Sequence, residues 1–176
     1  MIIPHYYEDP HMLHENTMPN RAYYVPASKR MDNLIEHREQ SDRLQSLNGS
    51  WKFRYYKSIH DLQDEFYKTD YPVEEYDTVP VPGVWQNYGY ESHQYIESDY
   101  PFPVDPPYVP LDNPCGAYIH KFQYKTNADA PKVYLEFEGV DSCFYVWLNG
   151  TYVGYGQVSH SLNEYDITDQ IAEGEN

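Results

Sequence analysis

The amino-acid sequence predicts an all-β protein in which antiparallel strands form a sandwich or jelly roll. Three observations support this prediction: several segments alternate apolar and polar residues, an Asn-Gly pair joins two of these runs, and helical periodicity is weak. A period of two residues is typical of strands with one buried face. Short strands linked by turns, with little helix, favour an antiparallel sandwich over a mixed architecture.

The first part of the chain carries little strand pattern. Residues 1–26 are polar, rich in Pro, His and Asn, and are expected to form an extended arm that packs on other domains or subunits. Ser58 and Asp61 form an S-x-x-D capping pattern, which predicts a short helix over residues 58–67. The predicted organisation is an arm and linker over residues 1–45, followed by a sandwich over residues 46–176.

The strand pattern dominates the remainder of the chain. The Asn149-Gly150 pair lies between two alternating runs and predicts a tight hairpin with a type I′ turn. Six prolines fall within residues 101–114. Because proline lacks the backbone donor of a central strand, this stretch is expected to be a stiff surface loop. The predicted strands cover residues 51–55, 118–124, 133–137, 144–148 and 151–155.

Composition excludes several classes of function. The chain has 28 acidic and 12 basic residues, a net charge of -16, and a surface this acidic repels nucleic acids and anionic membrane surfaces. We therefore expect neither as a partner. The sequence shows no signal-peptide pattern and no apolar run of membrane-spanning length, so a cytoplasmic protein is expected. Cys115 and Cys143 lack metal-ligand and disulfide spacing and are expected to be free thiols.

The search for catalytic motifs finds no self-contained active site. Glycosidases need two facing carboxylates, and Glu97, Asp99 and Asp105 cluster near the proline-rich stretch, where solvated loop carboxylates are the expectation. The eight histidines show no metal-ligand spacing, so no metal site is expected within the chain. The 21 tyrosines suit the binding of sugar rings, although tyrosine is also common in strands, and both interpretations stay open.

Four stretches carry a resemblance to a known family: SLNGSWKF at residues 46–53, VPGVWQNYGY at 81–90, YPFPVDPPYVPLDNPCGAY at 100–118 and FEGVDSCFYVWLNGTYVGYGQ at 137–157. In this order and spacing they resemble the N-terminal sugar-binding domain of family 2 glycoside hydrolases. The stretch ENTMPNRAYYVP, residues 15–26, resembles the arm that precedes this domain in the long bacterial β-galactosidases. The resemblance implies a galactose-binding-domain-like jelly roll.

The resemblance also implies which domains of a longer enzyme carry the catalytic residues. In the family, an immunoglobulin-like domain and a TIM barrel follow, and both catalytic glutamates lie on the barrel. The chain is therefore expected to hold no catalytic residue and to be inactive alone, within a parent enzyme that hydrolyses terminal β-D-galactosides with retention. No cofactor is expected for this domain, while Mg and Na ions are candidate cofactors of the parent. The last sandwich strands are expected beyond Asn176, leaving a sheet edge for self-association.

One loop is implied to reach the substrate. The family loop Y-T-N-V-x-Y-P matches residues 95–101, in which Glu97 replaces the Asn that holds galactose; Glu97 and Ser98 are the candidate substrate-binding residues. An ionised carboxylate only accepts hydrogen bonds, whereas an amide also donates, so Glu97 lacks the donor that the family Asn offers the sugar. Residues 158–162 depart from the family where relatives carry Arg and Pro, and His160 is expected to be a surface residue.

Three other interpretations stay open. The chain could be a free-standing carbohydrate-binding module, the corresponding domain of a β-glucuronidase or β-mannosidase, or a complementing fragment that restores an N-terminally deleted partner. The long arm and the proline-rich stretch favour a β-galactosidase.

Overall fold

The computed structural model describes residues 3–94 and 102–176. In this part of the chain every strand pair is antiparallel, and the helices are short 3-10 turns, so the predicted all-β antiparallel fold is confirmed. The strands are β1 His14–Glu15, β2 Gly49–Tyr56, β3 Asp77–Val81, β4 Cys115–Ile119, β5 Gln123–Tyr124, β6 Tyr134–Phe137, β7 Cys143–Leu148, β8 Thr151–Gln157, β9 Asn163–Asp166 and β10 Gly174–Glu175. The 3-10 turns are η1 Tyr6–Glu8, η2 Arg38–Gln40, η3 Ile59–Asp61 and η4 Trp85–Tyr88.

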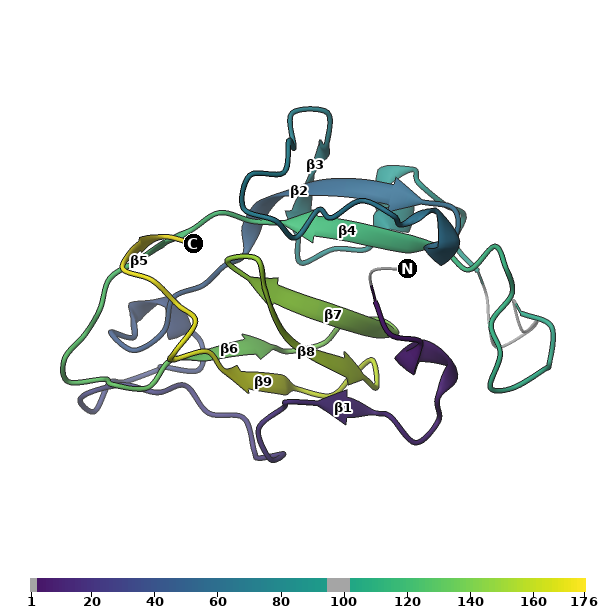
Figure 1. Ribbon diagram of the computed structural model, residues 1–176. Coiled ribbons are helices and arrows are strands. Elements are labelled where there is room, and N and C mark those ends of the chain that lie inside the picture. Colours follow the sequence, from purple (N-terminus) through teal and green to yellow (C-terminus); the bar gives the residue numbers. More distant parts are fainter. Residues whose placement is uncertain (1–2, 95–101) are drawn as a thin grey trace.

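The strands form layers that Figure 1 shows clearly. The sheet β3-β2-β4 lies at the top, and β7 and β8 lie beneath it with β6 and β9 below. The arm strand β1 joins the free edge of β8, and β10 pairs with β5. The predicted hairpin between β7 and β8 is present: Asn149 and Gly150 have φ angles of 51° and 79°, the two positive values that a type I′ turn requires.

Two hydrophobic cores use opposite faces of β7. On one face, Tyr145 and Trp147 pack against a cluster that contains Tyr56 of β2 and Ala117 of β4. On the other face, residues of β7 pack with β8 and β9 around Tyr165, whose side chain is fully buried. The inner face of the upper sheet therefore carries Tyr56, and the alternation of β2 turns Phe53 to the outer face.

The prediction of a helix over residues 58–67 is wrong, because only the short turn η3 forms there. Ser58 does cap this turn, since its Oγ accepts a hydrogen bond from the His60 amide at 3.1 Å. The Ile59 amide donates to the Asn113 carbonyl oxygen at 2.8 Å, and the Ser58 hydroxyl donates to the Leu111 carbonyl oxygen. These bonds tie the turn to the proline-rich stretch, and the extended backbone of Leu62, with a φ of -76° and a ψ of 90°, ends the turn.

The segment predicted as one strand over residues 118–124 is divided into β4 and β5. Its first half pairs with β2, whereas Gln123 and Tyr124 pair with β10 instead. The chain leaves the upper sheet after Ile119, so one alternating run serves two different sheets.

The N-terminal arm lies along its own sandwich. The Gln157 amide donates to the Leu13 carbonyl oxygen at 2.9 Å, and the Met18 amide donates to the Glu164 carbonyl oxygen at 2.7 Å. In Figure 1 the purple segment follows the edge of β8 and then the lower layer. Packing of the arm on other domains or subunits stays a prediction. Among the described residues, none of the helices has the length and apolar character needed to cross a membrane.

Candidate functional site: the two flanks of the 95–101 loop

The predicted substrate-binding residues Glu97 and Ser98 lie outside the described residues, as does Asp99. The chain on either side of this loop is described, and both flanks are attached to the upper sheet. Asp105, the remaining carboxylate of the predicted cluster, lies exposed in the following stretch, as expected of a solvated loop residue.

The first flank rests on an aromatic cluster on the outer face of β2 and β4. Phe53 is fully buried there, and its ring lies 4.8 Å from that of Tyr90, between centroids, in an edge-on arrangement. The Trp85 ring covers Tyr55 edge-on at 5.7 Å. Such pairs add to the free energy gained from burial, so η4 and Tyr90 are held firmly against the sheet. Gly89 ends η4 with a φ of 86°, a conformation that glycine adopts without strain.

Polar contacts fix Tyr90 and Glu91, a few residues before the loop. Glu91 accepts hydrogen bonds from Trp85 Nε1 at 2.9 Å and from Gln86 Nε2 at 3.2 Å, both at Oε2. The Tyr90 hydroxyl donates to Asp77 Oδ2 at 2.7 Å. Burial, helped by this bond, raises the pKa of Tyr90 to about 12, so the phenol stays a donor at neutral pH.

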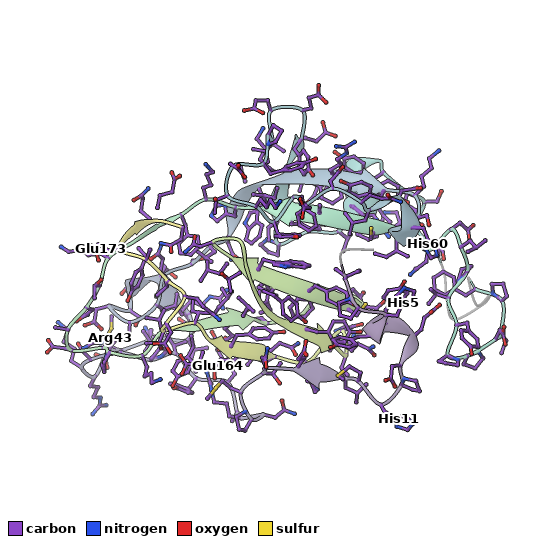
Figure 2. All side chains as sticks on the ribbon, in the orientation of Figure 1. His5, His11, Arg43, His60, Glu164 and Glu173 are labelled. Atoms are coloured by element: carbon purple, nitrogen blue, oxygen red, sulfur yellow. The ribbon has the colours of Figure 1, made fainter. Side chains whose placement is uncertain are left out.

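The second flank is the proline-rich stretch, and the structure confirms that residues 102–114 contain no strand. Internal turns shape it, with the Tyr108 amide donating to the Asp105 carbonyl oxygen at 2.9 Å. The Val109 amide donates to Glu8 Oε1 of the arm at 3.1 Å, and η3 binds the end of the stretch. In Figure 2, His60 of η3 lies at the end of the upper sheet where this stretch projects.

The projecting stretch carries an exposed apolar surface. Val104, Tyr108 and Leu111 are 83%, 63% and 79% exposed. The backbone beneath these side chains is held from two sides, by the arm and by η3. Both described flanks are thus tied to neighbouring elements, Tyr90 and Glu91 on one side and Val109 and Asn113 on the other.

The charged groups in the lower layer do not form a catalytic pair. Glu136 of β6 and Glu164 of β9 face each other across the ladder, and the Arg21 guanidinium lies between them. Arg21 Nε donates to Glu164 Oε2 at 3.1 Å, and Arg21 Nη2 donates to Glu136 Oε2 at 3.1 Å. Figure 2 labels Glu164 within this layer. A guanidinium fills the space that a glycosidase leaves for the sugar, so this arrangement is structural.

The remaining reactive groups are held in their neutral forms. Both cysteines are free, as predicted, and burial raises the pKa of the Cys115 thiol to about 12 and also raises that of Cys143. Neither thiol is therefore an activated nucleophile. Within residues 3–94 and 102–176, no three His, Cys, Asp or Glu side chains come together as metal ligands.

The anchoring roles of two carboxylates, Glu91 and Glu8, were not predicted from the sequence. Glu91 lies just beyond the VPGVWQNYGY stretch, and the nearby Trp85 and Gln86 are the local signal that could have identified its role. Glu8 binds a residue 101 positions away, which no local pattern can indicate.

Comparison with known proteins identifies the domain. A family model described as glycosyl hydrolases family 2, sugar binding domain, matches residues 44–176. The β-galactosidase of Actinobacillus pleuropneumoniae is 44% identical over 176 residues, which cover 100% of this chain and 17% of that protein. The β-galactosidase of Staphylococcus xylosus is 40% identical over 177 residues, with the same coverage of 100% and 17%. The chain thus spans about 17% of the length of these curated relatives.

Solved structures show the same fold. The β-glucuronidase of an uncultured Clostridium sp. superposes with a TM-score of 0.52 at 23% identity, over 75% of this chain and 20% of that one. A β-glucuronidase of Ruminococcus gnavus gives a TM-score of 0.52 at 16% identity, over 74% and 20%. These structures support the jelly-roll sandwich and carry no argument about substrate. Because the family model covers most of the chain and the relatives cover all of it, the protein belongs to the sugar-binding domain family of family 2 glycosyl hydrolases.

Proposed function

We propose that this domain serves a β-galactosidase that hydrolyses terminal β-D-galactosides with retention of configuration. The observation that carries the proposal is the 44% identity to a curated β-galactosidase over the whole chain, arm included. The glucuronidases that share the fold are less than 25% identical, so they give no comparable support for a glucuronide substrate.

In this proposal the 95–101 loop forms part of the active-site rim. Its flanks are held by the Phe53 cluster on one side and by Glu8 and η3 on the other. Because flanks held in place reduce the conformational entropy lost on binding, these anchors would contribute to the affinity for a sugar. Glu97 would accept hydrogen bonds from galactose hydroxyls, and Ser98 could both donate and accept.

The chemistry itself would come from other domains of the enzyme. Retaining hydrolysis needs two carboxyl groups about 5–5.5 Å apart with the sugar between them. The Glu136–Glu164 pair is bridged by Arg21, and the described residues contain no group of three metal-ligand side chains, so neither would supply the catalytic groups. The role proposed for Mg and Na ions belongs to the parent enzyme.

Activity measurements test this division of labour. The 176-residue chain alone should not hydrolyse a chromogenic β-galactoside, because it would supply only one rim of the site. The full-length polypeptide that contains this domain should hydrolyse it and release the β-anomer first, as seen by proton NMR. Turnover by the purified chain, or a clear preference of the long polypeptide for a β-glucuronide, would contradict the proposal.

Substitution of Glu97 tests the rim loop. In the full-length polypeptide, Glu97→Ala should lower kcat/KM for a β-galactoside about tenfold, because a hydrogen bond to a charged group is lost. Glu97→Gln, which keeps an acceptor and adds a donor, should retain more activity than the alanine variant. Asp105→Ala is the matched control, since this carboxylate is exposed on the neighbouring stretch and should leave kcat/KM unchanged. Equal values for wild type and Glu97→Ala would remove Glu97 from the site.

A further inference from the structure

A pocket of about 430 Å³ lies between residues 23–38 and one end of the lower layer. We propose that this pocket is a second carbohydrate subsite that binds one neutral hexose unit. The inference goes beyond the proposed active-site role and does not depend on the 95–101 loop. The residues that line the pocket are Tyr23, Ile35, Arg38, Glu138, His160 and Leu162.

The polar wall matches the hydrogen-bonding groups of a sugar. Arg38 Nη1 donates to the Tyr23 hydroxyl at 3.1 Å and also pairs with Glu138 Oε1. A guanidinium has five N–H donors, and Arg38 Nε and Nη2 have no protein partner among the described residues. Glu138 Oε2 is likewise an open acceptor in this part of the chain. Free donors beside a free acceptor suit two adjacent hydroxyls, each of which both donates and accepts.

The apolar wall offers a surface for the C–H face of a sugar ring. Tyr23 is 45% exposed, and its ring contacts no other aromatic ring among the described residues. Ile35, which is 86% exposed, and the half-buried Leu162 complete this wall. The apolar face of a tyrosine ring can pack on the C–H face of a sugar, and its hydroxyl can bind the sugar hydroxyls.

Hydrogen bonds hold the linker segments that form the pocket in place before a ligand binds. The Ser28 amide donates to Asp42 Oδ1 at 3.0 Å and the Ser41 hydroxyl donates to the Pro26 carbonyl oxygen, which closes residues 26–42 into a compact loop. The Glu36 amide donates to the Asn33 carbonyl oxygen at 3.0 Å within that loop.

The opposite wall is shaped by a turn at the start of the segment that joins β8 to β9. Val158 has a φ of 73°, and the Ser161 amide donates to its carbonyl oxygen at 2.9 Å. This turn brings His160 to the pocket. Binding would therefore need little rearrangement of the protein.

The charge of the pocket decides between classes of sugar. The Arg38 cation is paired with the Glu138 carboxylate, so the pocket carries no net positive charge that would favour an acidic sugar. The chain as a whole carries a net charge of -16, which disfavours anionic ligands further. A neutral hexose is the ligand that fits both observations.

A titration monitored by amide shifts tests the subsite in the 176-residue chain. Methyl β-D-galactoside and methyl β-D-glucoside should each shift the amide signals of residues 23, 38, 138 and 160, saturating at millimolar concentrations. Glucuronate should shift them less. No shift up to about 100 mM, shifts confined to other residues, or tighter binding of glucuronate would each overturn the proposal.

A pair of neighbouring tyrosines supplies the matched variants. Tyr23→Ala should weaken binding at least about tenfold, because it removes the ring and a partner of Arg38. Tyr24→Ala is the control: Tyr24 is 55% exposed and its ring lies under the Arg21 guanidinium at 4.3 Å, outside the pocket lining. Unchanged signals elsewhere in each spectrum would verify the fold. Equal affinities of the two variants would overturn the assignment.

Discussion

Replacing Phe53 by alanine is expected to lower the free energy of unfolding by about 3–5 kcal/mol, a value typical of a fully buried phenylalanine in a packed core. The Phe53 side chain is 0% exposed and lies between the sheet and the segment that covers it. Gly116 on β4 explains how tightly it fits, because a Cβ at that position would lie 2.5 Å from Phe53 Cε2. The alanine variant would leave a cavity surrounded by the rings of Tyr118, Tyr90 and Trp85, whose centroids lie 4.6, 4.8 and 6.3 Å away.

Urea unfolding followed by tryptophan fluorescence gives the measurement. Phe53→Leu should cost less than the alanine variant because it fills more of the space. Tyr134→Ala is a suitable control: Tyr134 is on β6, is 43% exposed, and its loss should change stability by less than about 1 kcal/mol. Hydrogen exchange at residues 85–91 should also accelerate in Phe53→Ala, since this ring supports them. A stability loss no larger than that of the control would show that the cluster is loosely packed.

Phe53 also shows how far the sequence could predict the fold. The alternation of residues 51–55 identifies a strand with an aromatic face, and β2 confirms it. The same alternation cannot tell which face meets the second layer. In the structure Tyr56, on the other face, enters the core between the layers, while Phe53 is covered by η4. Both faces of β2 are covered, one by the second layer and the other by η4, so the burial of each face depends on segments distant in sequence.

The candidate site was predictable only in part. The position of Glu97 follows from a resemblance between loops, whereas the anchors of that loop depend on long-range contacts. The Val109 amide reaches Glu8 across 101 positions, and such pairing exists only once the arm lies on the sandwich. The helix predicted over residues 58–67 shows the same limit: the Ser58 cap forms, but the buried Leu62 takes an extended backbone conformation that ends the turn.

Replacing Arg21 by alanine is expected to cost about 3 kcal/mol of stability, since it leaves two neighbouring carboxylates without their cation. The Glu164 side chain is only 10% exposed, and Glu136 faces it across the β6–β9 ladder. Arg21 remains 27% exposed, which places the expected loss at the lower end of the values for buried ion pairs. Arg30→Ala removes the same charge from an exposed residue and should be nearly neutral. Arg21→Lys should recover only part of the loss, because an ammonium cannot bind two carboxylates in the same planar geometry.

The pH dependence of the Arg21→Ala variant gives a second, independent test. Burial raises the pKa of Glu136 in the folded protein, and Arg21 opposes this shift. A carboxyl group whose folded pKa is raised contributes stability at low pH that is lost as pH rises through that pKa. Without Arg21 the pKa of Glu136 should rise further, so the stability difference between wild type and variant should shrink from about pH 8 to about pH 5.5. The lower limit stays above the sequence pI of about 4.6, where the chain would lose its net charge. A difference that stays constant over this range, or that equals the loss in Arg30→Ala, would show that Arg21 does not hold the two carboxylates together.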